Sequence, residues 1–126
     1  LARLVILAVF LPVMAGQTGN TGCQALAVTL RGMTLGEVKA SNQLALVRKE
    51  AVLGFFNGLF VGITAGAGMW FYANMQGEPN PLEFGLVVMV AMVGACTASG
   101  IAGALIPLTL KRFGADPATA SSIFLT

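Results

Sequence analysis

The sequence has no histidine and few charged residues, and each shortage excludes a class of function. Without imidazole there is no Ser-His or Cys-His nucleophile pair, no zinc site with a histidine ligand and no haem with a histidine axial ligand. Only 10% of the residues are charged, and a formal net charge of +2 is too small to indicate a nucleic-acid surface. We therefore expect no enzyme chemistry and no nucleic-acid partner.

Cysteine is also scarce. The two cysteines, Cys23 and Cys96, both lie inside apolar runs of the sequence. A thiol in such surroundings behaves as a small hydrophobic group, so we expect packing to be its role.

Hydrophobic residues, in contrast, make up 56% of the chain, which is more than a water-exposed surface tolerates. Lipid is the solvent that fits this composition. Sixteen glycines fall mostly inside or beside the apolar runs, where membrane helices use glycine for close packing. The composition predicts an all-α membrane protein, a polytopic helix bundle in a lipid bilayer.

Four apolar stretches define the expected spans. A hydrocarbon core of roughly 30 Å needs about 20 helical residues, and the stretches run from Leu1 to about Leu30, from about Ala51 to Met75, from about Phe84 to Leu110 and from Pro117 to Thr126. We expect three full spans plus the start of a fourth, all within one transmembrane domain of residues 1–126. Because a protein rarely ends so early in a helix, we also expect this chain to be a fragment of a longer protein.

The links between the stretches predict an orientation. The links at residues 31–49 and 111–112 contain six of the seven basic residues, whereas the link at residues 74–83 has two acids and no base. By the positive-inside rule the basic links face the cytosol and the acidic link is external. The first basic link is also long enough for a short amphipathic helix on the membrane surface, with apolar positions at Leu35, Val38, Leu44 and Leu46.

Uncharged polar side chains interrupt the first stretch. If this segment is helical, four of them share one face at i, i+3, i+4 and i+7; we call this set the polar stripe, and its members are Gln17, Asn20, Thr21 and Gln24. At membrane depth such a stripe faces a water-filled path or a partner helix. We interpret it as pore-lining, since four amides and hydroxyls are more than interhelical hydrogen bonding usually requires, and such bonding is the alternative.

The second full stretch has glycine at every fourth position, namely Gly54, Gly58, Gly62 and Gly66. This small-xxx-small repeat predicts a smooth groove in which another helix lies closely, and we assign it a packing role only. Asn57 stands alone among apolar neighbours on the same stretch, and we expect it to make a packing hydrogen bond rather than bind an ion.

Asp116 directly precedes Pro117, where a new helix is expected to begin. An aspartate at this position can cap the first turn of the helix. By the predicted orientation it also lies at the cytosolic end of a span, where a carboxylate can hold a hard cation or its hydration shell. The two roles are compatible and both stay open.

Two sets of motifs resemble a known family. Residues 10–16 and 19–27, with Arg31-Gly32 and Gly36-Glu37 after them, resemble the second transmembrane helix and following link of MgtE-type magnesium transporters. Residues 105–107 followed by Gly114-Ala115-Asp116-Pro117-Ala118 resemble the junction of that family's last two helices. The resemblance covers essentially the whole chain and would make its segments the second helix to the start of the fifth in a five-helix domain.

The resemblance implies a homodimer in a bacterial or archaeal plasma membrane, with a central magnesium pore lined by the second and fifth helices. Mg²⁺ would be both the transported ion and the ligand, and cytosolic CBS-type regulatory domains are expected in many bacterial parent proteins. Asn20 matches the family's pore asparagine, and Asp116 matches the acid at the cytosolic start of the last helix. The family's principal magnesium-coordinating aspartate would lie just beyond Thr126, outside this sequence.

Magnesium transport fits the chemistry of the polar stripe. Mg²⁺ sheds water reluctantly, so a filter can bind the hydrated ion through hydrogen bonds from the oxygens of residues such as Asn20, Thr21 and Gln24. Two alternatives remain. One is a secondary transporter that uses the glycine-rich part of the first stretch as a substrate site, and the other is a non-transporting membrane scaffold in which the stripe joins two subunits.

Overall fold

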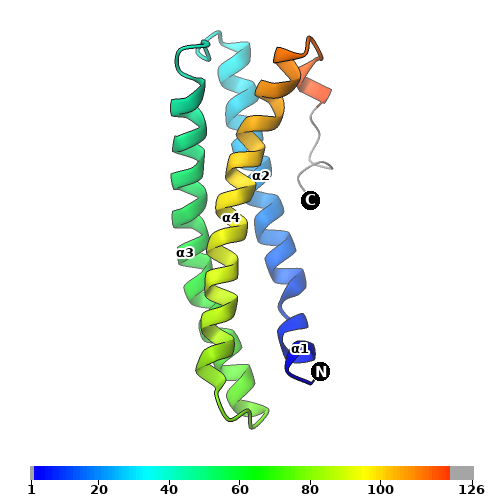
Figure 1. Cartoon of the computed structure of the whole chain (residues 1–126), viewed down its shortest axis with the longest axis vertical. Coiled ribbons are helices and arrows are strands. Elements are labelled where there is room, and N and C mark those ends of the chain that lie inside the picture. The colour runs from blue at the N-terminus through cyan, green and yellow to red at the C-terminus, as the bar shows by residue number, and fades with distance from the viewer. Residues whose placement is uncertain (1, 120–126) are drawn as a thin grey trace.

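The computed structural model of the chain describes residues 2–119. It contains four α-helices and a short 3₁₀ turn, namely α1 (Ala2–Ala8), α2 (Leu11–Thr34), α3 (Gln43–Met75), α4 (Pro81–Arg112) and η1 (Pro117–Thr119). The three long helices run side by side along the long axis of the molecule, with α1 at the lower end beside the N-terminus (Figure 1). No strand occurs among the described residues, so the expected all-α fold is confirmed.

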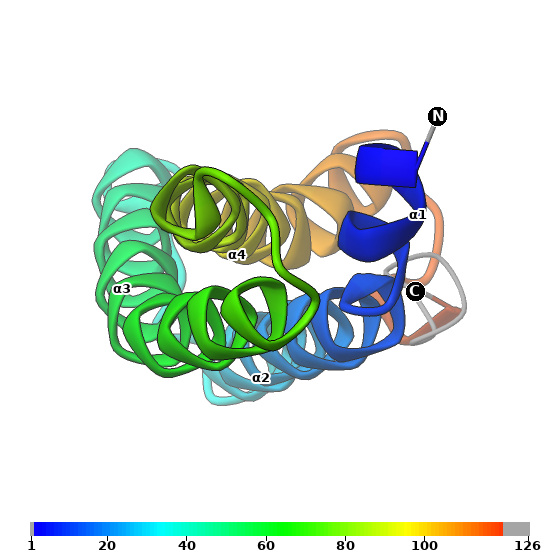
Figure 2. The ribbon, with the colours of Figure 1, turned by 90° about the horizontal axis from the view of Figure 1, so that it is seen from below.

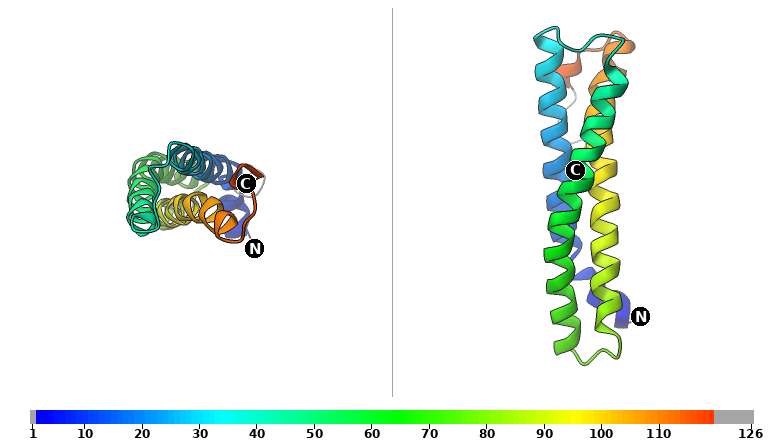
Figure 3. Two further views of the ribbon diagram at one scale, coloured as in Figure 1. Left: turned by 90° about the horizontal axis from the view of Figure 1, so that it is seen from above. Right: turned by 90° about the vertical axis from the view of Figure 1, so that its left-hand side faces the viewer.

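The bundle is organised around α4, which packs against both α3 and α2. Helices α2 and α3 make little direct contact with each other. The end-on view shows the three long helices as an open arrangement rather than a closed ring (Figure 2), and the side view shows α3 in front, with α2 behind it on the left and α4 behind it on the right (Figure 3). A groove lined by residues of both α2 and α3 is described below.

Two of the helices, α3 and α4, are long and apolar enough to cross a membrane. With 33 and 32 residues, each is about 50 Å long, which exceeds a hydrocarbon core of roughly 30 Å. Helix α2 has 24 residues, but polar side chains interrupt it. Among the described residues it is not one of the helices whose hydropathy is high enough to cross a membrane. Of the expected fourth span only η1 is described, and the rest lies outside the described residues.

The first apolar stretch is not one continuous helix. It breaks between Ala8 and Leu11, because Pro12 has no N–H to donate and its ring clashes with the carbonyl four residues earlier, which is that of Ala8. The chain turns tightly there, with the N–H groups of Val9 and Phe10 donating to carbonyls three residues back at 3.4 and 3.1 Å. The sequence prediction of a single element from Leu1 to about Leu30 was wrong at this point.

Helix α3 begins eight residues earlier than its apolar stretch, at Gln43 rather than near Ala51. Its first two turns include Arg48 and Lys49, which are exposed, and long charged side chains are good helix formers. The amphipathic helix expected in the link is absent, because residues 35–42 are not helical and Leu44 and Leu46 belong to α3 itself.

Each long helix ends in the same way, with a glycine of positive φ two residues after its last residue. Gly36, Gly77 and Gly114 have φ angles of 71°, 73° and 75°, a backbone conformation that suits glycine because it has no Cβ. The next N–H in each case donates to the carbonyl five residues back, at 2.9, 3.1 and 2.9 Å. These are Schellman motifs, and they reverse the chain into each link.

The four-residue glycine repeat of α3 is buried against α4. A Cβ added at Gly54, Gly58 or Gly66 would lie 2.6 to 2.8 Å from backbone atoms of α4, and one at Gly62 would lie 3.0 Å from the Met89 carbonyl oxygen. The approaches at Gly54, Gly58 and Gly66 are closer than real Cβ atoms make, and the one at Gly62 is tighter than most, so the two helix backbones meet directly on four successive turns of α3. The groove expected on this face is therefore filled by α4.

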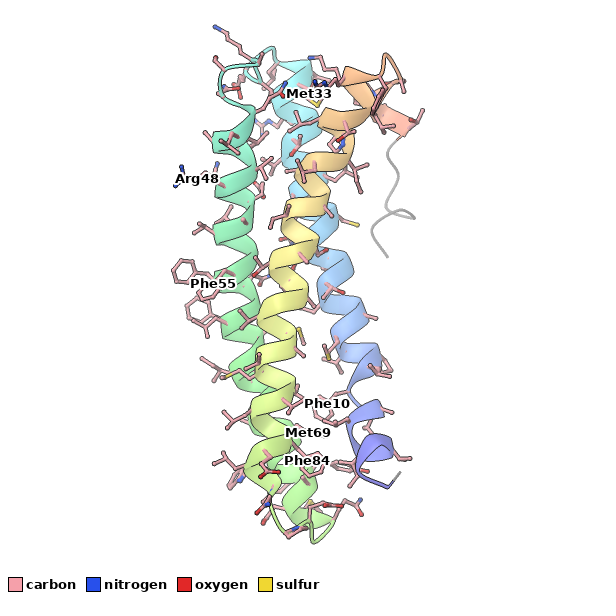
Figure 4. All side chains as sticks on the ribbon, viewed as in Figure 1. Phe10, Met33, Arg48, Phe55, Met69 and Phe84 are labelled. Atoms are coloured by element: carbon pink, nitrogen blue, oxygen red, sulfur yellow. The ribbon has the colours of Figure 1, made fainter. Side chains whose placement is uncertain are left out.

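Many large apolar side chains lie on the outside of the bundle, while its interior holds mainly methionine, cysteine and small residues together with Phe84. Met69, Met92 and Cys96 are fully buried, whereas Phe60 and Val90 are 68% and 65% exposed. Figure 4 shows Phe55 pointing outward from α3, with Met69 and Phe84 at the lower end of the bundle. A broad apolar exterior is what a lipid environment favours and what water penalises.

Candidate functional site

The polar stripe of α2 divides into two halves in the structure. Asn20 and Gln24 are exposed, whereas Gln17 is half-buried and Thr21 is buried. All four lie on consecutive turns of one helix, as their spacing predicts, but the helix is rotated so that only one edge of the stripe turns towards α3.

The inner half of the stripe binds α3 through Asn57. The Asn57 side-chain amide donates to the Thr21 hydroxyl oxygen at 2.7 Å, and the Gln17 amide donates to the Asn57 carbonyl oxygen at 3.4 Å. The Thr21 hydroxyl in turn donates to the Gln17 backbone carbonyl at 3.0 Å. The interhelical hydrogen bond expected of Asn57 is present, and it uses two of the four side chains that we interpreted as pore-lining.

The outer half of the stripe has no such role. Among the described residues, neither Asn20 nor Gln24 has a hydrogen-bond partner for its side chain. Both amides therefore remain available to water, an ion or a second subunit.

Contacts with α4 fix the rotation of α2. The Ser99 hydroxyl donates to the Thr18 backbone carbonyl at 2.6 Å, and Gly103 meets the Gly22 carbonyl so closely that a Cβ would not fit. Both contacts lie on the side of α2 that faces α4, within one turn of Asn20. Because this side is occupied, Asn20 and Gln24 are held facing away from α4.

A groove of about 400 Å³ opens beside the stripe, between α2 and α3 and with α4 as its floor. We call it the α2–α3 groove, and its lining residues are Thr21, Gln24, Val28, Glu50, Leu53, Gly54, Phe56, Asn57 and Gly100. Hydroxyl, amide and carboxylate groups thus converge in a site otherwise walled by apolar side chains.

Glu50 is the feature that the sequence analysis missed. Its side chain is only 5% exposed, and its Oε1 atom is buried without a hydrogen-bond partner among the described residues. The sequence analysis left it between the basic link at residues 31–49 and the apolar stretch from about Ala51, with no role assigned. The spacing could have indicated its burial. Glu50 lies four residues before Gly54, so it continues the glycine repeat on the face of α3 that packs on α4.

Asp116 lies near the C-terminal end of α2, away from the polar stripe. Its Oδ1 accepts a hydrogen bond from the Ala118 N–H at 2.9 Å, so the capping role is present in η1. The carboxylate is exposed and lines a pocket with the last turns of α2, at Leu30 and Met33. Asn20 is ten residues before Leu30, or about 15 Å along the helix, so one ion cannot contact both residues directly.

No group of three or more His, Cys, Asp or Glu side chains that could hold a metal ion occurs in the described part of the chain. The oxygen-bearing side chains that line the α2–α3 groove are one carboxylate, two amides and one hydroxyl.

Comparison with known proteins identifies the family. A family model named MgtE and described as a divalent cation transporter matches residues 11–126. The magnesium transporter MgtE of Enterococcus faecalis is 37% identical over 96% of this chain, that of Bacillus subtilis is 31% identical over 100%, and that of Thermus thermophilus is 29% identical over 97%. No solved structure matches the chain at a significant level.

The chain spans 25%, 27% and 26% of these three relatives, or about a quarter of their length. The family description names a transporter, which agrees with the expectation that the chain has no enzyme chemistry. The family match extends over nearly all of the chain, through α2, α3, α4 and η1. The chain belongs to the MgtE family of divalent cation transporters.

Proposed function

We propose that this chain forms part of a magnesium path across a membrane, in a longer protein that transports the ion. The observation that carries the proposal is the outer half of the polar stripe: Asn20 and Gln24 are exposed in the middle of α2 and have no hydrogen-bond partner among the described residues. Unpaired amides are costly against lipid. They are stable if they face water and hydrated ions, and the names of the three relatives support magnesium as the ion.

The proposed path binds hydrated magnesium rather than the bare ion. Magnesium prefers octahedral oxygen coordination and keeps most of its water, so the amide oxygens of Asn20 and Gln24 would accept hydrogen bonds from that water. Asp116 would supply negative charge at the end of α2, where it is exposed. Because the two levels are separated along α2, an ion would meet them in succession.

In the proposed topology α2, α3 and α4 all cross the membrane, and η1 begins a fourth span. The links after α2 and after α4 lie at one end of the bundle and the link after α3 lies at the other (Figure 1). This arrangement supports a cytosolic side at the basic links, residues 31–49 and 111–112, and an external side at residues 74–83.

The proposed assembly is a homodimer with Asn20 close to the two-fold axis. Three helices cannot enclose the outer half of the stripe, since α4 occupies the opposite side of α2. A second copy related by a two-fold axis would place a matching stripe against it and form a path between the subunits. Cytosolic regulatory domains, which the resemblance implies, would lie in the part of the parent protein that this chain does not cover.

Disulfide cross-linking tests the assembly. In a full-length parent protein with Cys23 and Cys96 replaced by alanine, we expect Asn20→Cys to form a cross-linked dimer under mild oxidation, because two-fold symmetry would bring the two thiols together. Phe60→Cys is the matched control, since Phe60 points outward from α3 and is 68% exposed. Equal cross-linking of both variants, or none at Asn20, would contradict the proposed dimer.

Magnesium uptake by the reconstituted parent protein tests the function and separates the alternatives. A pore should admit magnesium down its own gradient with no proton or sodium gradient imposed. Uptake that depends on such a gradient would indicate the secondary transporter instead. An absence of uptake in well-folded dimers would indicate the scaffold, and the stripe would then serve only to join subunits.

A further inference from the structure

Glu50 is the one buried acid among the described residues. Its side chain is 5% exposed, its Oε1 atom has no hydrogen-bond partner there, and it borders the α2–α3 groove. A buried carboxylate without a partner is destabilising, so such groups are usually paired or bind a cation. Lys49 is the basic side chain whose charge acts on this carboxylate, but Lys49 and Arg48 are exposed and do not line the groove.

The rest of the groove offers groups that suit a hydrated cation. Thr21 and Gln24 on α2 and Asn57 on α3 all line it. The Asn57 amide is already committed to the Thr21 hydroxyl at 2.7 Å, which holds the two walls at a fixed spacing. Gln24 is exposed and has no partner among the described residues, so its amide can turn toward the groove.

The size of the groove agrees with an ion that keeps its water. Six water molecules at about 30 Å³ each occupy roughly 180 Å³, and the groove has a volume of about 400 Å³. One carboxylate per chain cannot replace the hydration shell of a divalent cation, but it can neutralise part of the charge while amides accept hydrogen bonds from the water. An anion would be repelled, and an apolar ligand would leave the carboxylate unpaired.

We propose that the α2–α3 groove binds a hydrated divalent cation through the Glu50 carboxylate, at a site whose lining includes neither Asn20 nor Asp116. The inference rests on the proposed function for the identity of the ion as a divalent cation. It adds a charged position beside the polar stripe, which otherwise consists of neutral groups. An ion held there would lie next to Gln24 and could pass to the amides of the stripe.

Binding of Mn²⁺ to the full-length parent protein, followed by electron paramagnetic resonance of the unbound ion, tests the site. Mn²⁺ is a hard divalent cation with a direct signal, and the measurement does not depend on transport. We expect Glu50→Gln to remove one bound Mn²⁺ per chain, or to weaken its binding at least about tenfold, because the variant keeps the shape of the side chain and removes its charge. Glu83→Gln is the matched control, since Glu83 is an exposed acid on α4 and its loss changes the net charge equally.

Location and folding are checked separately. Anomalous scattering from Mn²⁺ in crystals of the full-length protein should place an ion in the groove beside Glu50. If Glu50→Gln does not fold, Gln24→Leu replaces an exposed residue and should weaken the same ion by a smaller factor. Unchanged Mn²⁺ binding in Glu50→Gln would overturn the site and leave Glu50 as a neutral hydrogen-bonding group. If Glu50→Gln cannot be purified, unchanged binding in Gln24→Leu would overturn it in the same way.

The outcomes separate this site from the proposed function. Loss of the ion in Glu50→Gln with no magnesium uptake by the unmodified protein would support the site and contradict transport. Normal uptake with unchanged Mn²⁺ binding in Glu50→Gln would support transport and overturn the site.

Discussion

Replacing Gly58 with leucine is expected to separate α3 from α4 and to reduce the yield of folded protein sharply. A Cβ at this position would lie 2.8 Å from the Val93 Cα and 2.9 Å from the Met92 carbonyl oxygen, so even the first added carbon meets backbone that cannot turn aside. Forcing larger side chains into a packed core typically costs about 1 to 3 kcal/mol. That range corresponds to roughly a 5- to 150-fold fall in the ratio of folded to unfolded protein.

Gly94→Leu is the matched control for this effect. Gly94 lies on α4, is exposed, and has no atom within 4 Å of its would-be Cβ, so the same substitution meets no backbone there. The measurement is the amount of monodisperse protein recovered by size-exclusion chromatography, together with its thermal midpoint in detergent. Equal behaviour of the two variants would show that the contact between α3 and α4 is not as close as the structure has it.

The helical architecture could be predicted because the chemistry that determines it is local. The apolar stretches predicted α3 and α4, and the glycines from Gly54 to Gly66 predicted a face for close approach. The break before α2 was missed although Pro12 signals it, because the apolar run continues through the proline without a change in composition. Gly36, Gly77 and Gly114 could likewise have predicted where the three long helices end, but the prediction of the spans rested on hydropathy alone.

The candidate site was harder to predict because it depends on how the helices rotate against each other. Spacing alone placed Gln17, Asn20, Thr21 and Gln24 on one face, but only contacts with α4 determine that Thr21 turns inward and Asn20 turns outward. Glu50 was missed because α3 begins earlier than its apolar stretch, and the start of a helix with charged residues in its first turns is poorly marked by hydropathy.

Replacing Asn20 with leucine in the full-length parent protein is expected to reduce magnesium uptake strongly. The change removes an amide that would bond to a hydrated ion and keeps an approximate size. Asn20 is exposed and bonds to no other described side chain, so the fold of the subunit should not change. Leaving a polar partner unsatisfied costs about 1 to 3 kcal/mol, which is roughly a 5- to 150-fold slower uptake if the loss is felt in the rate-limiting barrier.

Thr21→Val separates the two halves of the polar stripe. Thr21 is buried and accepts the hydrogen bond from Asn57. Valine should therefore lower the free energy of unfolding by about 1 kcal/mol, and it should reduce magnesium uptake less than Asn20→Leu does. A stripe that serves only to join helices would show the reverse order, since its inner half makes the interhelical bonds.

Magnesium uptake into proteoliposomes by correctly dimeric Asn20→Leu, compared with the unmodified protein at equal dimer content, tests the central claim most directly. If the outer half of the stripe lines the path, uptake falls at least about fivefold while the dimer fraction and thermal midpoint stay the same. Unchanged uptake in a well-folded Asn20→Leu dimer would contradict the claim that magnesium passes along this face of α2.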